Sequence, residues 1–318
     1  MPSIRQRFKS ILSWLLPLAS LGLLAAVVVG QLAGPYFFLF DLAGQFAVQY
    51  VGLGTLLLAW SMLAGRWRWA LVNGLSVGWQ AALVLPWLTA QPPLLTPGRP
   101  GFRVMHANVL FTRPDIQNTL DLVAQQQADL IVLQEMTVEQ IPRAAAYFQA
   151  TYPHTDTVRA KGLSHIMVLS RTPFRVDAAA KQSHQVIHLT TNIRGHAVEL
   201  MTVHPRPPIF PGWFADRNRK LAFVSERFQR TRQPALLIGD FNISPFAPLY
   251  RRWFQQPGVH ACRYGFGLQP TWPRFLPVAY LPIDHAFVND RLSTRQFTVL
   301  TQRGSDHQAV RVDLQFRP

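Results

Sequence analysis

The stretch Ala235-Leu236-Leu237-Ile238-Gly239-Asp240-Phe241-Asn242 is an apolar strand pattern that ends in a carboxylate and an amide. Because side chains alternate along a strand, Asp240 and Asn242 lie on the same side and can reach one reacting group. Near the C-terminus, Gly304-Ser305-Asp306-His307 precedes a second apolar strand pattern. A carboxylate that orients water, an amide that donates to a phosphate oxygen and a His-Asp pair together suit phosphate-ester hydrolysis.

Four further strand patterns carry polar residues of the same kinds at one end. They are 102–109, with Asn108 near its end, 129–135, which ends in Glu135, 198–204, which ends in His204, and 283–288, with Asp284 near its start. Helical patterns cover 114–127, 137–150 and 215–229 between strand patterns. Strands with helices between them predict a mixed α/β domain.

The polar motifs at these strand ends resemble, in kind and in order, those of the endonuclease/exonuclease/phosphatase family of metal-dependent phosphoesterases. The resemblance covers roughly residues 101–318, about two-thirds of the chain. It implies an α/β fold in which two packed β-sheets are flanked by helices, a four-layer α/β sandwich. The site would lie at one edge of that sandwich, where the strand ends converge.

The resemblance also implies a divalent metal site. Its expected ligands are Asn108, Glu135 and Asp306. Carboxylate oxygens are the ligands that Mg²⁺ or Mn²⁺ prefers, and such ions keep several waters, so few protein ligands are expected. The histidines outside the motifs described above show no metal-ligand spacing, which argues against a zinc site.

Catalytic roles follow from the same resemblance. Asp240 corresponds to the residue that positions or deprotonates the attacking water, and Asn242 and His204 to donors to the phosphate oxygens. Asp284 and His307 correspond to an acid-base pair, in which the carboxylate holds the imidazole in one tautomer and stabilises its charged form.

One departure from the nuclease branch stands out. There, an acid on a strand upstream of the first catalytic histidine orients that histidine, whereas Gly162 to Pro173 of this chain contains no Asp or Glu. The chain also has no clear match to the site tyrosine of the abasic-site enzymes. Both absences weaken a nuclease interpretation without excluding it.

Residues 1–92 form a different kind of segment, a predicted membrane domain. Three apolar stretches, Ile11 to Ala33, Tyr36 to Ala64 and Trp69 to Ala90, each exceed the ~20 residues needed to cross a bilayer core. The alternative is a signal peptide followed by buried core helices. The first stretch is long for a signal-peptide core, and no clear Ala-x-Ala cleavage site follows it. We therefore expect three transmembrane helices.

The basic residues predict the orientation of these helices. Arg5, Arg7 and Lys9 precede the first span, Arg66 and Arg68 lie between the second and third, and the turn between the first and second carries no Lys or Arg. The positive-inside rule then places the N-terminus in the cytoplasm. Three spans put the domain at 102–318, after a Pro/Gly-rich linker at 93–101, on the periplasmic or extracellular side of a bacterial inner membrane.

Composition agrees with this division. The chain is 49% hydrophobic and 15% charged, against about 25% charged residues in an average soluble protein. Its net charge is +15, of which residues 1–92 contribute +4. A basic domain suggests either an anionic partner or adaptation to an anionic bilayer. The single cysteine, Cys262, excludes an internal disulfide.

The loop from Pro205 to Lys220 is rich in Pro, aromatic residues and cations. Arg206, Trp213 and Arg217 are its candidate substrate-binding residues. Its apolar side chains would dip into a bilayer interface, stack on nucleic-acid bases or pack beneath the loop as a small core.

The sequence therefore predicts a membrane-anchored, divalent-metal-dependent phosphoesterase that acts outside the cytoplasm. Membrane-anchored bacterial members of the family have similar layouts, which suggests a lipid-linked phosphate or pyrophosphate as substrate. The first alternative is an extracytoplasmic nuclease acting on nucleic acid. The second is a non-catalytic domain that binds phosphorylated ligands, but no expected metal ligand or catalytic histidine is missing. No protein partner is evident.

Overall fold

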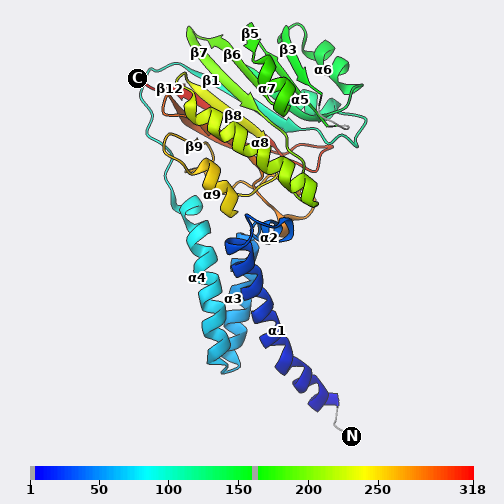
Figure 1. Ribbon diagram of the computed structural model, residues 1–318, viewed down its shortest axis with the longest axis vertical. Helices are drawn as coiled ribbons and strands as arrows, with labels where there is room; N and C mark the ends of the chain where they lie inside the picture. Colours follow the sequence, from blue (N-terminus) through cyan, green and yellow to red (C-terminus); the bar gives the residue numbers. More distant parts are fainter. Residues whose placement is uncertain (1–3, 160–163) are drawn as a thin grey trace. The chain divides into compact units, whose positions relative to one another are not determined.

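A computed structural model describes residues 4–159 and 164–318, and describes side chains from Trp14 onward (Figure 1). The chain divides into two compact units. The first is Met1–Trp87 with Ser244–Leu249, and the second is Leu88–Ile243 with Tyr250–Pro318. The domain boundaries expected from the sequence, 1–92, 93–101 and 102–318, remain a prediction.

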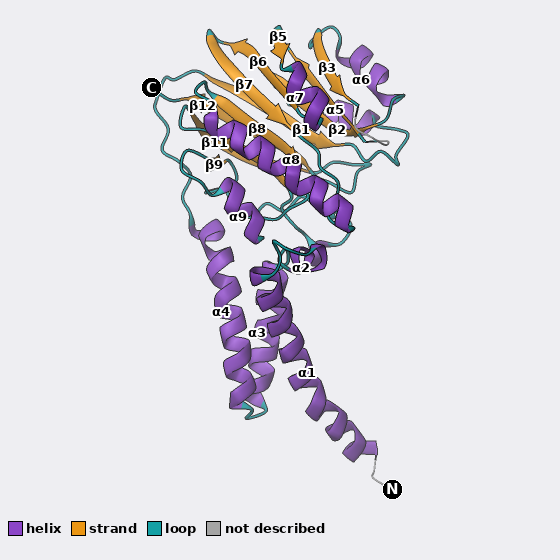
Figure 2. Cartoon of the chain, viewed as in Figure 1, coloured by secondary structure: helices purple, strands orange, loops and turns teal. Residues whose placement is uncertain are grey.

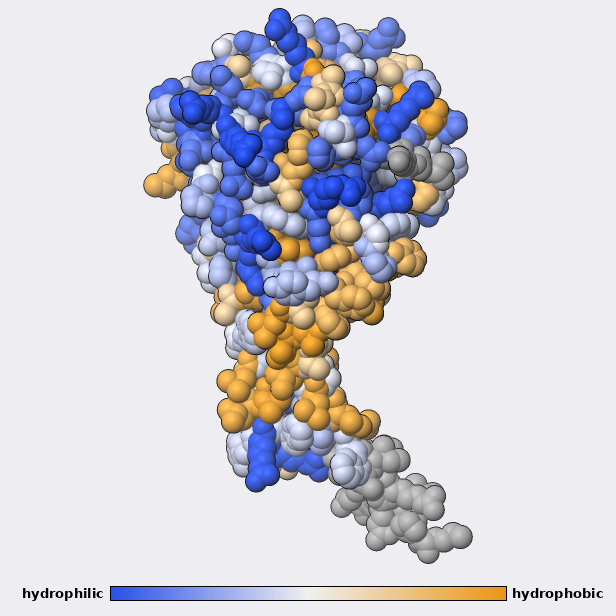
Figure 3. All heavy atoms as spheres, viewed as in Figure 1, coloured by the Kyte–Doolittle hydropathy of each residue, from blue (hydrophilic) through white to orange (hydrophobic). Residues whose placement is uncertain are grey.

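The first unit is helical. Its helices are α1 (Ile4–Leu32), α2 (Phe38–Ala43), α3 (Ala47–Leu63) and α4 (Trp67–Thr89), the last of which extends just beyond the unit. Hydrophobic side chains cover much of the outer surface of these helices (Figure 3). A surface of this kind is expected of helices whose solvent is lipid rather than water.

The structure changes one expectation for this segment. Among the described residues, two helices, Trp14–Leu32 and Trp67–Thr89, are long and apolar enough to cross a membrane. The predicted second span is instead broken after α2 and continues as the 17-residue α3. Seventeen residues of helix rise about 25 Å, which is less than the ~30 Å hydrocarbon core. The predicted count of three full-length spans is therefore not confirmed. A Cβ on Gly30 of α1 would lie 2.7 Å from the backbone nitrogen of Gly44, so the chain at the break packs closely against α1.

Polar side chains join the helices of this unit. Asn73 Nδ2 donates to Ser20 Oγ at 3.0 Å and to Ser61 Oγ at 3.1 Å, which connects α4 to α1 and α3. The short segment Ser244–Leu249 belongs to the same unit, because Ser244 Oγ donates to the carbonyl oxygen of Gln45 at 3.0 Å. Buried side-chain hydrogen bonds of this kind help to fix how helices pack against one another.

The second unit contains two mixed β-sheets. Within the described part of the chain, the first sheet has six strands in the order β11-β12-β1-β2-β4-β3 and the second has six in the order β5-β6-β7-β8-β10-β9. The strands of the first sheet are β1 (Gly101–Asn108), β2 (Leu130–Met136), β3 (His154–Val158), β4 (His165–Ser170), β11 (Leu292–Leu300) and β12 (Ala309–Phe316). Those of the second are β5 (Phe174–Val176), β6 (Ile187–Ile193), β7 (His196–Thr202), β8 (Ala235–Asp240), β9 (His260–Ala261) and β10 (Asp284–Val288).

Helices cover the outer faces of both sheets, as the four-layer sandwich requires (Figure 2). They are α5 (Gln117–Gln125), α6 (Gln140–Phe148), α7 (Ala178–His184), α8 (Pro211–Arg230) and α9 (Pro248–Phe254), with the 3₁₀ turn η1 (Pro277–Ala279). The predicted α/β fold is confirmed, and the predicted helices 114–127, 137–150 and 215–229 correspond to α5, α6 and α8. The short elements β3, β5, α7, α9 and β9 were not predicted, since segments of two to seven residues carry little periodicity.

Strand alternation divides the core into two layers. On β1, Phe102 and Val104 pack between the sheets, whereas Met105 and Ala107 pack beneath α5 and α6. The same parity places Leu130 and Val132 of β2 between the sheets. A sheet buried on both faces reads as a continuous apolar run, which is why these strands lack a polar side in the sequence.

The predicted linker is hydrogen-bonded to the C-terminal end of β12. Thr96 and Gln315 exchange two hydrogen bonds, and the amide of Phe316 donates to the carbonyl oxygen of Pro100 at 3.1 Å. Pro100 therefore extends the β1–β12 pairing by one residue, and Thr96 is tied to the Gln315 side chain. Cys262 is buried, and burial raises the pKa of its thiol to about 12, which agrees with an inert cysteine.

Candidate active site

The strand parity of the inter-sheet core continues into the polar residues at one end of both sheets. On β1, Phe102 and Val104 are followed on the same face by His106 and Asn108. On β8, Ile238 is followed by Asp240, and on β10 Asp284 precedes Ala286. The register pairs Asp284 directly with Asp240. The core positions thus become site positions where the apolar side chains stop.

Glu135 reaches the site through a distortion of its strand. By parity, Leu133 and residue 135 would face the helical layer rather than the other sheet. The β2–β4 register shifts between Leu133 and Met136, and Glu135 has φ +59°. A bulge re-aims a side chain and is common beside active sites. A non-glycine residue in the left-handed region is uncommon, and the surrounding packing must hold it there.

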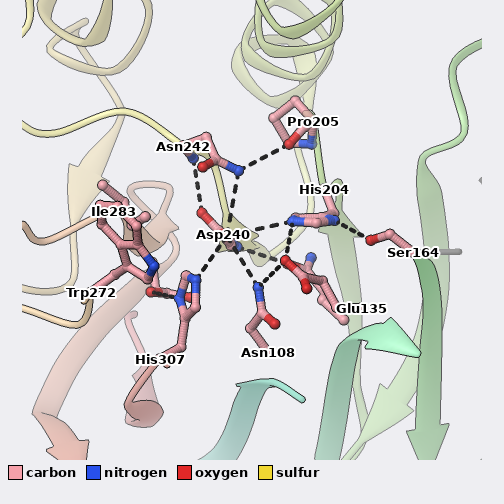
Figure 4. Close-up of polar contacts among 12 residues, drawn as sticks. Asn108, Glu135, Ser164, His204, Pro205, Asp240, Asn242, Trp272, Ile283 and His307 are labelled. Atoms are coloured by element: carbon pink, nitrogen blue, oxygen red, sulfur yellow. Dashed lines mark hydrogen bonds and ion pairs between the residues drawn. The ribbon is translucent and has the colours of Figure 1, made fainter. Parts of the chain in front are cut away.

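Asp240 is the centre of the polar cluster (Figure 4). Its carboxylate is fully buried and accepts from Asn108 Nδ2 at 3.2 Å and from the amide of Asn242 at 2.9 Å. Two imidazole nitrogens, His204 Nε2 at 3.5 Å and His307 Nε2 at 3.6 Å, approach the same carboxylate. Asn108 Nδ2 also donates to Glu135 Oε1 at 2.9 Å, so the amide bridges the two acids.

His307 and Asp284 form the expected pair. His307 Nδ1 lies 2.9 Å from Asp284 Oδ2, and both side chains are buried. Burial lowers the pKa of His307, but the negative charges of Asp284 and Asp240 outweigh it and raise the pKa to about 10. Burial likewise opposes ionisation of Asp284, yet His307 holds the pKa of this carboxyl far below its usual range. The pair is therefore an imidazolium and a carboxylate at neutral pH.

His204 has a hydroxyl partner that the sequence did not reveal. Ser164 Oγ lies 2.8 Å from His204 Nδ1, which leaves Nε2 directed at Glu135 and Asp240. The region Gly162 to Pro173 was expected to lack an acid that orients this histidine. Gly162 and Leu163 lie outside the described residues, but Ser164 occupies the orienting position with a neutral group. Burial lowers the pKa of His204, but the Asp240 and Glu135 carboxylates outweigh burial and raise it.

Gln134 ties the two sheets together at the site. Its Oε1 accepts from the amide of Asp240 at 2.9 Å, and its Nε2 donates to Thr202 Oγ1 at 2.9 Å. His106 Nε2 lies 3.1 Å from the same Oε1, and its Nδ1 lies 3.5 Å from Asp284 Oδ1. His106 thus links the Gln134 amide to the catalytic pair. Buried polar networks of this kind specify one arrangement of the groups they join.

Gly239 is required by this network. A Cβ at position 239 would lie 2.7 Å from both Gln134 Nε2 and Val203 O. We expect Gly239→Ala to lower the free energy of unfolding by ~1–3 kcal/mol, the usual cost of overpacking, and to lower activity by displacing Asp240. Chemical denaturation of the full chain in detergent measures the first effect.

A matched glycine provides the control. A Cβ on Gly212 in α8 would meet nothing within 4 Å, so Gly212→Ala is expected to leave stability unchanged or slightly improved. Equal stabilities of the two variants would contradict the close approach at Gly239.

The donor set fits a hard divalent cation. Glu135, Asp240 and His307 each bring a carboxylate oxygen or an imidazole nitrogen within 4.8 Å of the others. The protonated His307 has no free nitrogen lone pair for a metal, so the carboxylates are the candidate ligands of this group. Of the three expected ligands, Glu135 belongs to this group, Asn108 is hydrogen-bonded to it, and Asp306 lies outside it. Asp306 Oδ1 is nonetheless a buried oxygen without a hydrogen-bond partner in the described part of the chain. Buried polar atoms usually have a partner, so this oxygen is available to bind a metal ion. Carboxylate oxygens of this kind suit Mg²⁺ or Mn²⁺.

Glu135→Ala tests the metal assignment. We expect the variant to need at least roughly tenfold more Mg²⁺ or Mn²⁺ for half-maximal hydrolysis, because it loses a direct carboxylate ligand. Rates measured against metal concentration after dialysis with a chelator give the comparison. Glu139→Ala, which removes an exposed acid four residues away, is the control. Full wild-type activity in the chelator would show that no metal is needed.

The three candidate substrate-binding residues differ in accessibility. Arg206 is exposed, and its guanidinium lies 5.3 Å from the ring centroid of the half-buried Trp213. Arg217 is fully buried, and its Nη1 donates to the carbonyl oxygen of Asn242 at 3.2 Å. Arg217 is thus placed to hold the backbone of Asn242, and Arg206 to face the surroundings. Trp213 and Phe214 lie half-buried in the first turn of α8, whereas Phe210 remains 54% exposed. The predicted loop Pro205 to Lys220 is therefore a loop only as far as Phe210, and its second half is the start of α8.

Two packed sheets with carboxylates, amides and imidazoles gathered at one end define a metal-dependent phosphoric ester hydrolase. The chain belongs to the Endonuclease/Exonuclease/phosphatase family, whose sequence model matches residues 105–307. A search of curated proteins found no match. The predicted family and enzyme class are confirmed.

Solved structures show the same fold at low sequence identity. A humanized D. rerio TDP2 is 14% identical with a TM-score of 0.57, and the match covers 68% of this chain and 99% of that one. An endonuclease/exonuclease/phosphatase from Beutenbergia cavernae is 19% identical with a TM-score of 0.54, covering 69% and 72%. A Neisseria 3′ phosphatase, NExo, bound to a product DNA hairpin, is 21% identical with a TM-score of 0.54, covering 68% and 100%.

Proposed function

We propose that this protein is a membrane-anchored phosphoesterase that hydrolyses a phosphate ester or pyrophosphate bond of a lipid-linked substrate outside the cytoplasm. The observation that carries the proposal is the presence, in one chain, of a phosphoesterase site and apolar helices long enough to cross a membrane. Anchoring confines an enzyme to the layer in which a lipid-linked phosphate is held, which raises the effective concentration of that substrate. Nucleic acid gains no such advantage.

The residues divide the chemistry as follows. Asp240 orients the attacking water and accepts its proton, and Asn242 and His204 donate to the non-bridging phosphate oxygens. The imidazolium of His307, held by Asp284, stabilises the charge that develops on the phosphate. Asn108, Glu135 and Asp306 would hold Mg²⁺ or Mn²⁺, which as a Lewis acid would polarise the phosphoryl oxygens.

Phosphate release identifies the substrate class. The full chain, in detergent and in liposomes, is offered a lipid phosphate, a lipid pyrophosphate, a soluble phosphomonoester and duplex DNA, each with and without Mg²⁺. We expect phosphate from a lipid substrate and little DNA cleavage, with an Asp240→Asn preparation as the control for contaminating activity. Efficient DNA cleavage at low enzyme concentration, with no phosphate from any lipid, would favour the extracytoplasmic nuclease. That alternative draws support from the DNA bound to the Neisseria structure.

The orientation can be tested separately. The basic residues on either side of the apolar helices place the N-terminus and the loop at Arg66 and Arg68 in the cytoplasm. The side chains of Arg5, Arg7 and Lys9 lie outside the described part. Alkaline phosphatase fused after Pro100 is expected to be active, and a fusion after Arg66 inactive. The reverse pattern would return the catalytic domain to the cytoplasm.

A further inference from the structure

The loop from Trp272 to Leu281 is fastened at its base to the catalytic residues. Trp272 and Leu281 pair as an isolated β-bridge, and the amide of Asp284 donates to Thr271 Oγ1 at 3.2 Å. The indole Nε1 of Trp272 donates to Asp306 Oδ2 at 2.9 Å. The base of the loop therefore touches both a candidate metal ligand and the backbone of the catalytic acid.

Arg274 completes this attachment. Its amide donates to the carbonyl oxygen of Asp306 at 2.8 Å, and its Nε donates to that of Ser305 at 3.1 Å. Tyr280 Oη closes the loop by donating to the carbonyl oxygen of Arg274 at 2.6 Å. These hydrogen bonds join the loop to the turn Ser305–His307. A displacement of the loop would therefore also displace this turn of the site.

The tip of the loop is apolar and faces solvent. Phe275 is 72% exposed, Leu276 45% and Val278 78%, and Pro277 between them is also exposed. Exposing four consecutive apolar residues to water is unfavourable, and such runs usually mark a site of interaction. The backbone of this tip is held in place by the 3₁₀ turn η1 (Pro277–Ala279) and by the Arg274 hydrogen bonds.

Two cations near the loop in sequence or on the turn that supports it favour a lipid bilayer as the partner of the tip: Arg274 directly precedes Phe275, and Arg303 lies on the turn before Ser305. Arg303 is exposed, and the chain carries a net charge of +15. Apolar tips flanked by cations bind the interface of anionic membranes, where the side chains enter the acyl boundary and the cations meet the headgroups. The same chain contains helices long enough to cross a membrane, and a protein anchored by them would have a bilayer as a neighbour.

We propose that the tip Phe275–Val278 inserts into the acyl boundary of an anionic bilayer and thereby holds the turn Ser305–His307 at the level of the lipid headgroups. Insertion deepens the proposed function, because it would bring a lipid phosphate to the site. The insertion itself does not depend on which phosphate is hydrolysed. In the segment Pro205–Lys220, Ile209 and Phe210 are exposed, whereas Trp213 and Phe214 are half-buried at the start of α8.

A single label tests insertion. Val278→Cys in the full chain is labelled with a polarity-sensitive fluorophore and reconstituted into phosphatidylcholine liposomes that contain phosphatidylglycerol; the native Cys262 is buried. We expect a blue-shifted emission and quenching by lipids that carry a nitroxide on the acyl chain. The same label at Tyr147→Cys, an exposed position on α6, is the control and should remain unquenched. Water-like, unquenched emission at position 278 would overturn the proposal.

Turnover tests the consequence. The triple variant Phe275→Ser, Leu276→Ser, Val278→Ser is expected to slow hydrolysis of a lipid phosphate in liposomes at least tenfold, since each side chain loses its apolar burial. Hydrolysis of a soluble phosphomonoester should change less than about twofold, because the tip holds no catalytic group. An unchanged lipid rate contradicts the proposal. If the wild-type protein hydrolyses no lipid while the label is quenched, the proposed substrate fails and insertion stands.

Discussion

Asp240→Asn is expected to lower phosphoester hydrolysis by ~10²–10⁴-fold while leaving the fold intact. The substitution keeps the shape of a fully buried side chain but removes its charge and its ability to accept a proton. It also replaces an acceptor of two amide hydrogen bonds, from Asn108 and Asn242, with a group that can accept fewer. Steady-state rates with a soluble phosphomonoester, beside thermal unfolding, separate lost chemistry from lost structure.

The control for Asp240→Asn is an acid outside the site. Asp115 is exposed and pairs with Arg143 at 3.0 Å, so Asp115→Asn should change neither rate nor stability appreciably. Unchanged turnover in Asp240→Asn would rule out this mechanism. Parallel loss of activity and of the folded state would reassign Asp240 to a structural role.

Asp284→Asn is expected to cost a similar factor, ~10²–10⁴-fold at neutral pH, and to change the pH dependence. Asp284 is the largest influence that raises the pKa of His307 to about 10, against the lowering effect of burial. A histidine with a raised folded-state pKa stabilises the fold fully below ~6.5 and loses that contribution as pH rises through the raised value. The wild-type imidazolium therefore persists through neutral pH.

Without the Asp284 carboxylate, only Asp240 and Asp306 oppose the effect of burial, so the pKa of His307 falls and its proton is lost at lower pH. We expect the residual activity of Asp284→Asn to fall as pH rises through the neutral range, where the wild-type rate is flat. Asp290 and His260 form an exposed pair at 2.6 Å elsewhere in the domain, so Asp290→Asn is a matched control. Parallel pH profiles of Asp284→Asn and the wild type would show that His307 does not depend on this partner.

Much of the fold was predictable because it rests on local periodicity. Strands such as β2 and β8 begin as continuous apolar runs, which is typical of strands buried on both faces. The alternation expected to place Asp240 and Asn242 on one side does not apply, because β8 ends at Asp240 and Asn242 follows with φ +50°. The short elements β3, β5, β9, α7 and α9 escaped prediction, because two to seven residues give too few repeats to recognise.

The residues of the site could be predicted from the sequence, but the contacts between them could not. Resemblance supplied Asn108, Glu135, Asp240 and His307, whose contacts the structure describes. It could not supply Ser164, because a lone serine has no distinguishing pattern and meets His204 only after β4 and β7 are brought together. For Arg217 the sequence indicates a cation but not its burial, which depends on how α8 packs.

The sequence by itself determined the alternation of strands and helices, the apolar N-terminal segment and the order of the polar strand ends, since each depends on neighbours a few residues apart. Tertiary structure decided the rest. Strand parity would turn Glu135 away from the site, and only a bulge stabilised by contacts with other segments reverses it. Likewise, the exposure of Phe275 and the break before α3 depend on tertiary packing contacts, which the local sequence does not reveal.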